Sequence, residues 1–194
     1  MVFKWKLMIS VIIIGHNEGK YVKKMLHALK SKCPDYNRLW VLDRCTDNSE
    51  NILKKENEKY VLTPDNLIGR QTSYSRNLGL QYVSDNDDIL FLDGDRYPMA
   101  GIVNFSKWKA EIGLLMLDGD FRDDIDDYND IYGQVHNGFF SCGLFLKRSA
   151  IKKITKFQKG ELFRTDIQDE WGIEDVYLGD VCYHLQLTCD IYRW

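Results

Sequence analysis

The chain has 194 residues, of which 44% are hydrophobic and 28% are charged, and its formal net charge is −3. This length suits one domain with a substantial core, and the composition is that of an ordinary globular protein. The slight acidic excess argues against nucleic acid as the main partner, because phosphate binding requires a basic surplus.

Cysteine usage and the start of the chain bear on the compartment. None of the five cysteines forms a Cys-x-x-Cys pair: Cys33, Cys45, Cys142, Cys182 and Cys189. An odd number without framework spacing favours reduced thiols in a cytoplasmic protein and argues against zinc.

The opening MVFKWKLMISVIII imitates a signal peptide, but it leads into GHNEGK without a small-residue cleavage site. Since the apolar run is also too short for a transmembrane segment, we expect a buried first strand.

Apolar runs alternate with amphipathic stretches in the first half of the chain. The run at 7–14 is followed by an apolar stripe at helical spacing: Val22, Met25, Leu26 and Leu29. The strand-like RLWVL (38–42) precedes TDNSENILKK, in which Asp47 and Glu50 have the spacing of an N-cap and its returning carboxylate. Two strands with a helix after each are therefore predicted.

The same alternation continues to residue 92. YVLT (60–63) is followed by a polar turn and then by a helix with Tyr74, Leu78 and Tyr82 on one side, and DILFL (88–92) comes next. Strands that alternate with helices predict a mostly parallel sheet covered on both faces.

Beyond residue 98 the alternation is less regular. Residues 98–108 predict a helix, 112–117 a buried strand, 118–130 an acidic loop, 139–147 a further strand and 174–187 a final helix. Lysines at helical spacing predict one more solvated helix face: Lys152, Lys153, Lys156 and Lys159. Because no repeat or linker divides the chain, we expect a single domain over residues 1–194.

Three polar clusters follow three of the predicted strands. GHNEG (15–19) comes after the first strand, DRCTDN (43–48) after the second and DGDR (93–96) after the fourth. In an open parallel sheet, ligands bind outside the carboxyl ends of the strands. We therefore expect the three clusters to meet at one edge and to form a site.

Asp93 and Asp95 repel each other across Gly94 and require a neutralising partner. Magnesium or manganese takes one or two carboxylates and completes its shell with water and phosphate oxygens. A solvated Asp-Gly turn is the alternative. Asp118-Gly119-Asp120 nearly repeats the motif, but the earlier copy directly follows the third strand–helix unit and so shares its edge with the other clusters.

Each of the remaining candidates at this edge has a structural alternative. The amides of GHNEG open a helix and favour acceptor groups, or Asn17 simply caps that helix. Asp43 can accept a hydrogen bond from a base or ribose, or it belongs to a capping loop. Arg70 and Arg76 hold a base or diphosphate, or they are surface arginines.

Taken in order, these motifs resemble those of glycosyltransferase family 2, which has the GT-A fold. The motifs are ISVIIIGHNEG, WVLDRCTDNS, NLIGRQTSYSRNLGL and ILFLDGDR. Two later segments, NGFFSCGLFLKRSAI and WGIEDVYLGD, resemble the acceptor segment and the Glu-Asp helix start of related galactosyl- and hexosaminyltransferases. The resemblance implies an α/β, Rossmann-like GT-A domain with a mostly parallel central sheet flanked by helices. Its nucleotide-binding half would be about 1–98 and its acceptor half about 99–194.

The resemblance implies transfer of a sugar from a nucleoside diphosphate sugar, with a UDP-sugar favoured, to a hydroxyl of a carbohydrate or glycoconjugate. A divalent metal, Mn²⁺ or Mg²⁺, would be held by Asp95 and Asp93. His184 is a further possible ligand, although a lone histidine on a partly apolar helix more often serves packing. The nucleotide-binding candidates are Gly15, His16, Asn17, Glu18, Asp43, Arg70, Arg76, Asp93 and Gly94.

Asp175, with Glu174 beside it, is the candidate general base. An acceptor hydroxyl is a poor nucleophile, so a carboxylate should take its proton as the new bond forms. A single displacement with one base inverts the anomeric centre. Neighbouring helical residues point about 100° apart, so only one acid can face the sugar, and the resemblance implies Asp175. The alternative is that both acids merely cap the helix.

Two residues depart from the family pattern, and two other functions compete with transfer. His16 stands where tyrosine is more usual, and Arg44 follows Asp43 where a second acid is common. A catalytically inactive nucleotide-sugar-binding module would lack an intact general base. A magnesium-dependent phosphatase of the haloacid dehalogenase type also has Asp-x-Asp after an apolar strand, but it normally begins near that motif. A Rossmann oxidoreductase would need a glycine fingerprint that is missing here.

Overall fold

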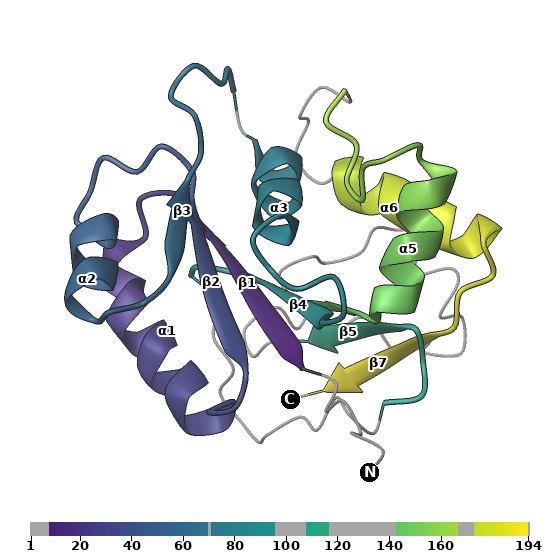
Figure 1. Ribbon diagram of the computed structural model, residues 1–194, viewed down its shortest axis with the longest axis horizontal. Coiled ribbons are helices and arrows are strands. Elements are labelled where there is room, and N and C mark those ends of the chain that lie inside the picture. The colour runs from purple at the N-terminus through teal and green to yellow at the C-terminus, as the bar shows by residue number, and fades with distance from the viewer. Residues whose placement is uncertain (1–7, 70, 96–107, 117–142, 167–172, 194) are drawn as a thin grey trace, which may run out of the picture.

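The computed structural model describes residues 8–69, 71–95, 108–116, 143–166 and 173–193. Its strands form one sheet in the order β3-β2-β1-β4-β6-β5-β7 (Figure 1). The strands are β1 (Ile9–Gly15), β2 (Asn37–Leu42), β3 (Tyr60–Leu62), β4 (Asp88–Asp93), β5 (Ile112–Met116), β6 (Gly143–Leu146) and β7 (Cys189–Arg193). Among the strands of the described residues, only β6 runs antiparallel to its neighbours, β4 and β5. The expected α/β class with a mostly parallel sheet is confirmed.

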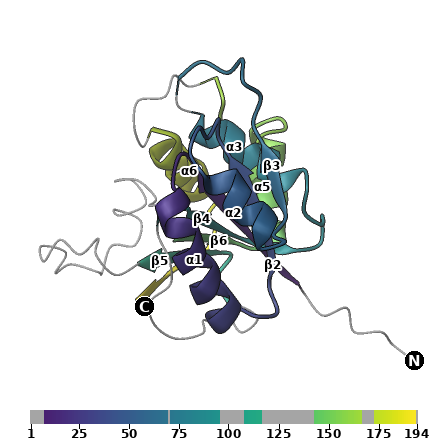
Figure 2. The ribbon, with the colours of Figure 1, turned by 90° about the vertical axis from the view of Figure 1, so that its left-hand side faces the viewer.

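Helices cover both faces of the sheet (Figures 1 and 2). Helices α1 (Gly19–Lys32) and α2 (Ser49–Lys55) contribute to one hydrophobic cluster. Helices α3 (Thr72–Leu80), α5 (Arg148–Phe157) and α6 (Ile173–His184) contribute to the other. None of the helices in the described ranges is long and apolar enough to cross a membrane.

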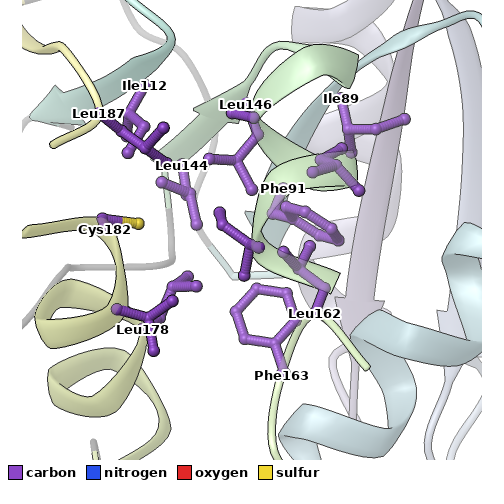
Figure 3. Packing of buried hydrophobic residues seen from close by; sticks show 14 of the residues in the cluster. Ile89, Phe91, Ile112, Leu144, Leu146, Leu162, Phe163, Leu178, Cys182 and Leu187 are labelled. Carbon is purple, nitrogen blue, oxygen red and sulfur yellow. The ribbon is translucent and has the colours of Figure 1, made fainter. Parts of the chain in front are cut away.

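The two clusters take alternate residues of the central strands, as the two-residue period of a strand requires. The cluster on the α1 side contains Val11, Ile13, Leu90 and Leu92, and the other contains Ile12, Ile89 and Phe91. Figure 3 shows Ile89 and Phe91 with Leu144, Leu146 and Leu178 in the second cluster. Because both faces are buried, the strands have continuous apolar runs, which is why the sequence predicted them well.

The face that α3 buries agrees only in part with the predicted one. Tyr82 is 61% exposed, whereas Ser75, Arg76 and Gly79 are buried. A Cβ atom on Gly79 would lie 2.5 Å from Cγ2 of Ile12, so α3 lies directly on the sheet. Of the three residues on the predicted side, Leu78 packs against the core, Tyr74 is half-buried and only Tyr82, beyond the end of the helix, is exposed.

The end of the chain also differs from the prediction. Helix α6 ends at His184 rather than at residue 187, and the unpredicted strand β7 pairs in parallel with β5. Five residues with a mixed polar and apolar pattern carry too little periodicity to reveal a strand. The predicted helix at 98–108, apart from its last residue, and the acidic loop at 118–130 lie outside the described residues.

Candidate functional site

Strands β1, β2 and β4 end at the same edge of the sheet. The register pairs Gly15 with Leu42 and Ile14 with Asp93. Past the strand ends, the N–H of Gly94 donates to the carbonyl oxygen of Ile14 at 2.7 Å, and that of Asp43 donates to Gly15 at 2.8 Å. Backbone hydrogen bonds therefore bring the three polar clusters together, as their position after parallel strands predicted.

Asn17 joins the first cluster to the second. Its Oδ1 accepts hydrogen bonds from the N–H groups of Thr46, at 2.7 Å, and Asp47, at 3.1 Å. Its φ of 60° is a left-handed conformation that asparagine tolerates better than most residues. Helix α1 is instead preceded by Glu18, which makes no side-chain cap. The alternative that Asn17 caps this helix is therefore wrong.

Asp47 links the first turns of α1 and α2. Its carboxylate accepts from the N–H of Gly19 at 2.7 Å and from the N–H of Ser49 at 2.9 Å. Burial raises the pKa of Asp47, but the hydrogen bonds from Ser49 and Gly19 outweigh it and hold that pKa below its ordinary value. Glu50 does not return to the helix start as predicted, because it pairs with Lys54 at 2.8 Å and accepts from the Tyr60 hydroxyl.

The carboxylate of Asp43 is occupied on both oxygens. Nε and Nη2 of Arg44 lie 2.7 Å from Oδ1 and 3.0 Å from Oδ2, and the Thr63 hydroxyl donates to Oδ1 at 2.9 Å. Burial raises the pKa of Asp43, but the Arg44 and Thr63 hydrogen bonds outweigh it and lower the pKa. His16 reaches the same place, with Nδ1 2.6 Å from the Asp43 carbonyl oxygen.

The contacts of Arg44 account for a basic residue at the position where the resemblance leads one to expect a second acid. Its Nη1 donates to the carbonyl of Leu67 and its Nη2 to that of Gly69, both at 2.6 Å. One side chain thus fixes the segment after β3 to the end of β2. An acidic residue at this position would have no hydrogen to donate to these carbonyl groups.

Glu18 joins Asp93 and Asp95 in one acidic region. A Cβ atom on Gly94 would lie 2.0 Å from Oε2 of Glu18, so this carboxyl group lies directly over the glycine. Burial, and then the charges of Asp95 and Asp93, raise the pKa of Glu18 to about 8. Its Oε2 is buried and has no hydrogen-bond partner among the described residues. The sequence predicted that the loops carrying Glu18 and these aspartates would meet, but it gave no sign that the Glu18 carboxyl group would lie over Gly94.

Arg76 is a buried cation next to this acidic region. Its side chain is 2% exposed, with Nη2 3.6 Å from Oδ1 of Asp93. On its other side, Nη1 lies 3.3 Å from Oε1 of Glu174 and 3.5 Å from Oδ1 of Asp175. Arg76 is thus not a surface arginine, and so deep a side chain presents almost no surface to a nucleotide. It joins the end of β4 to the start of α6.

The support beneath Arg76 is built by its neighbour in the sequence. The Arg76 guanidinium carbon lies 5.1 Å from the ring centroid of Phe163. Asn77 donates from Nδ2 to the carbonyl oxygen of Phe163 at 2.6 Å and accepts from its N–H at 3.0 Å. Phe163 in turn packs edge-to-face on Phe91 of β4, with ring centroids 5.3 Å apart. Helix α3 therefore supplies both the cation and the clamp that holds its aromatic support.

Some predicted site residues are not brought to this edge. His184 lies at the far end of α6 from Asp175, about 14 Å along a helix that rises about 1.5 Å per residue. Its ring contacts that of Phe157, with centroids 5.1 Å apart, so a role as metal ligand beside Asp95 is not supported. Arg70 and the second motif at 118–120 lie outside the described residues.

A divalent cation fits this edge if the substrate completes its shell. Within the described ranges, no three His, Cys, Asp or Glu side chains are arranged to hold a metal ion by themselves. Asp93 and Asp95 are nevertheless the one or two carboxylates that Mg²⁺ or Mn²⁺ uses when phosphate oxygens and water supply the rest. Oε2 of Glu18, which is buried beside this pair and has no hydrogen-bond partner among the described residues, is a further oxygen close to it. The donor set therefore suits an open site shared with a phosphate ligand.

Comparison with known proteins finds one family model and several solved structures that are similar to this chain. The model of the family described as "Glycosyl transferase family 2" matches residues 10–101. The search of curated protein sequences gave no match. Structural comparison finds S. aureus TarS 1-349 in complex with UDP-GlcNAc at a TM-score of 0.68 and 17% identity, covering 96% of this chain and 56% of that chain.

Two further solved structures are similar. The mannosyltransferase PcManGT from Pyrobaculum calidifontis, in complex with GDP-Man and Mn²⁺, has a TM-score of 0.68 at 13% identity, covering 98% of this chain and 56% of that chain. Mannosyl-3-phosphoglycerate synthase from Rubrobacter xylanophilus has a TM-score of 0.54 at 14% identity, and the match covers 75% of this chain and 54% of that chain. The chain thus spans a little over half the length of these structures. At such identities the likeness establishes the fold, which is the expected GT-A fold.

Proposed function

We propose that this chain transfers a sugar from a nucleoside diphosphate sugar to an acceptor hydroxyl, with inversion at the anomeric carbon. The observation that carries the proposal is the joining of Asp93 to the Glu174–Asp175 helix start through Arg76, at the carboxyl edge of a parallel sheet. The family match over residues 10–101 and the nucleotide sugars bound by proteins of the same fold support it.

Uridine is the base that the surroundings of Asp43 favour. An ionised carboxylate accepts about four hydrogen bonds, and Arg44 and Thr63 already supply three. The imide edge of uracil offers one N–H donor, whereas guanine offers adjacent N–H and NH₂ donors. A carboxylate with room for one donor therefore suits a UDP-sugar better than a GDP-sugar.

Asp95 and Asp93 would hold Mn²⁺ or Mg²⁺ together with the diphosphate of the donor. Such a cation, when bound, stabilises the charge that grows on the leaving diphosphate. Asp95 is exposed and Asp93 half-buried, so Asp95 is the more accessible ligand. Gly94 between them leaves room for the Glu18 carboxyl group and for close approach of the ligand.

Asp175 acts as the general base in this proposal. Its carboxylate takes the proton of the acceptor hydroxyl while that oxygen bonds to the anomeric carbon and the bond from this carbon to the diphosphate oxygen breaks. One displacement of this kind inverts the centre. Arg76 contacts both acids, with Nη1 3.3 Å from Oε1 of Glu174 and 3.5 Å from Oδ1 of Asp175.

A screen of sugar nucleotides tests the proposal. The protein is incubated with UDP- and GDP-sugars and Mn²⁺, with and without chelator, and the release of nucleoside diphosphate is measured. We expect metal-dependent release from at least one UDP-sugar. Magnesium-dependent hydrolysis of p-nitrophenyl phosphate, with no sugar nucleotide consumed, would instead favour a phosphatase and overturn the proposal.

A further inference from the structure

Arg76 contacts carboxylates that the proposed reaction uses for two different tasks. Asp93 lies on the side of the cation and the diphosphate, and Glu174 and Asp175 lie on the side of the acceptor. We propose that Arg76 is a positioning residue that competes with the divalent cation for Asp93 and, once the cation is bound, is committed to Glu174 and Asp175. This inference rests on the proposed function for its consequence in catalysis, but the competition itself can be measured without any transfer.

The distances around Arg76 describe a shared cation. Charge-assisted hydrogen bonds between N–H groups and carboxylates are usually about 2.7–2.9 Å long. Arg76 instead lies 3.6 Å from Asp93, 3.3 Å from Glu174 and 3.5 Å from Asp175. A guanidinium at these intermediate distances can shorten its contacts on one side by a small movement that lengthens those on the other.

The surroundings of Arg76 limit how far its guanidinium can move. The side chain is 2% exposed, and the ring of Phe163 lies beneath the guanidinium. Asn77 holds the backbone of Phe163 by two hydrogen bonds, so the support does not follow the side chain. The guanidinium therefore shifts between β4 and α6 and does not leave the cluster.

The charges decide which side is favoured. Without a cation, Asp93 and Asp95 attract Arg76 toward the sheet edge, whereas Glu174 and Asp175 attract it toward α6. A divalent ion at Asp93 and Asp95 cancels the first attraction and repels the guanidinium. The cation therefore strengthens the hold of Arg76 on the helix that carries Asp175, and by linkage anything that weakens this hold weakens cation binding.

The consequence is that Asp175 is held in place when the donor site is occupied. In the described part of the chain, no strand pairing connects the end of β4 with α6. The strand that follows α6 is β7, which pairs with β5. Arg76 links the end of β4 with the start of α6 through its contacts with Asp93, Glu174 and Asp175, and contacts between charged groups depend on the local charge. A cation and diphosphate at Asp93 thus act on the base through one side chain.

Mn²⁺ titration without nucleotide, followed by electron paramagnetic resonance, tests the competition. In Arg76→Met the cation loses its competitor, so Mn²⁺ should bind about 3- to 10-fold more tightly than in the wild type. In Glu174→Gln, Arg76 turns toward Asp93, so Mn²⁺ should bind about 2- to 5-fold more weakly. Arg38→Met removes the same charge near the start of β2, at the opposite end of the strands, and should leave the affinity within about twofold.

The two variants are expected to change the Mn²⁺ affinity in opposite directions, and this distinguishes competition from damage to the fold. A purely structural role of Arg76 predicts weaker Mn²⁺ binding in Arg76→Met, and that result in a folded variant overturns the inference. If Arg76→Met does not fold, Glu174→Gln decides, and an unchanged affinity there overturns it as well. Amide exchange adds a second readout: UDP with Mn²⁺ should slow exchange in the first turn of α6 in the wild type and not in Arg76→Met.

Failure of the inference and failure of the proposed function give different results. If the chain transfers no sugar but Arg76→Met binds Mn²⁺ more tightly, the competition stands and the function is wrong. If the wild type transfers sugar and the Mn²⁺ affinity of Arg76→Met is unchanged, the function stands and Arg76 does not compete with the cation.

Discussion

The carboxyl group of Glu18 fills the place that a side chain on Gly94 would need. A Cβ atom built on Gly94 would lie 2.0 Å from Oε2 of Glu18 and 3.1 Å from the carbonyl oxygen of Ile14. The glycine between the two aspartates is therefore required by a residue from another loop, in addition to any ligand that approaches it. This relationship leads to the first two predictions.

Gly94→Ala should destabilise the protein by about 1–3 kcal/mol, because the new methyl group displaces the Glu18 carboxyl group. Glu18→Ala removes the obstacle, so the double variant should recover part of that loss. Urea unfolding of the two single variants and the double variant measures the coupling, which we expect at about 1 kcal/mol. Strictly additive effects would show that the two side chains do not compete for this space.

The stability of the metal-free protein should fall as the pH rises from about 5 to 8. Burial and the charges of Asp95 and Asp93 raise the pKa of Glu18 from 4.5 to about 8, so the folded state favours the neutral carboxyl group. Its contribution is fully present below the unfolded pKa and is lost as the pH rises through the folded one. Unfolding in the presence of chelator should show a shallower pH dependence for Glu18→Gln. An identical slope would contradict the shifted pKa.

Asp95→Asn should lower Mn²⁺-dependent transfer by more than about 10²-fold without unfolding the protein, because the accessible metal ligand loses its charge. Calorimetry should show weaker UDP binding in the presence of Mn²⁺ and little change with chelator. Asp120→Asn in the second Asp-Gly-Asp motif is the matched control. If Asp120→Asn is inactive while Asp95→Asn is active, the metal site belongs to the other motif.

Asp175→Asn should lower kcat by about 10²-fold or more while leaving UDP affinity near that of the wild type. The amide keeps the shape of the side chain but cannot take the acceptor proton. Nuclear magnetic resonance of the product should show an inverted anomeric configuration. A retained configuration, or an active Asp175→Asn enzyme, would exclude Asp175 as the base of an inverting transfer.

Arg44→Gln should reduce the preference for UDP over GDP, because it frees acceptor positions on Asp43. It should also release the segment that Arg44 holds at Leu67 and Gly69, which protease digestion would detect as faster cleavage. Competition binding with the two nucleotides measures the preference. An unchanged ratio would show that the Asp43–Arg44 pair does not select the base.

Much of the fold and of the edge where the site lies could be read from the sequence, because both depend on local patterns. Strands that are buried on both faces have continuous apolar runs in the sequence, as β1 does. Parallel strands bring their carboxyl ends to one edge, so GHNEG, DRCTDN and DGDR could be placed together before any contact was known. The stripe from Val22 to Leu29 likewise predicted the buried face of α1.

Only the tertiary structure decided how the charged side chains pair. Glu18 with Gly94, and Arg76 with Asp93 and Asp175, are contacts between segments whose spacing in the sequence has no period. The close-packed part of the buried face of α3 was also hidden, because Gly79 contributes through its short distance from Ile12 rather than through hydrophobicity. Sequence periodicity reports which side of an element is apolar, whereas ion pairs and close contacts depend on where the elements pack against one another.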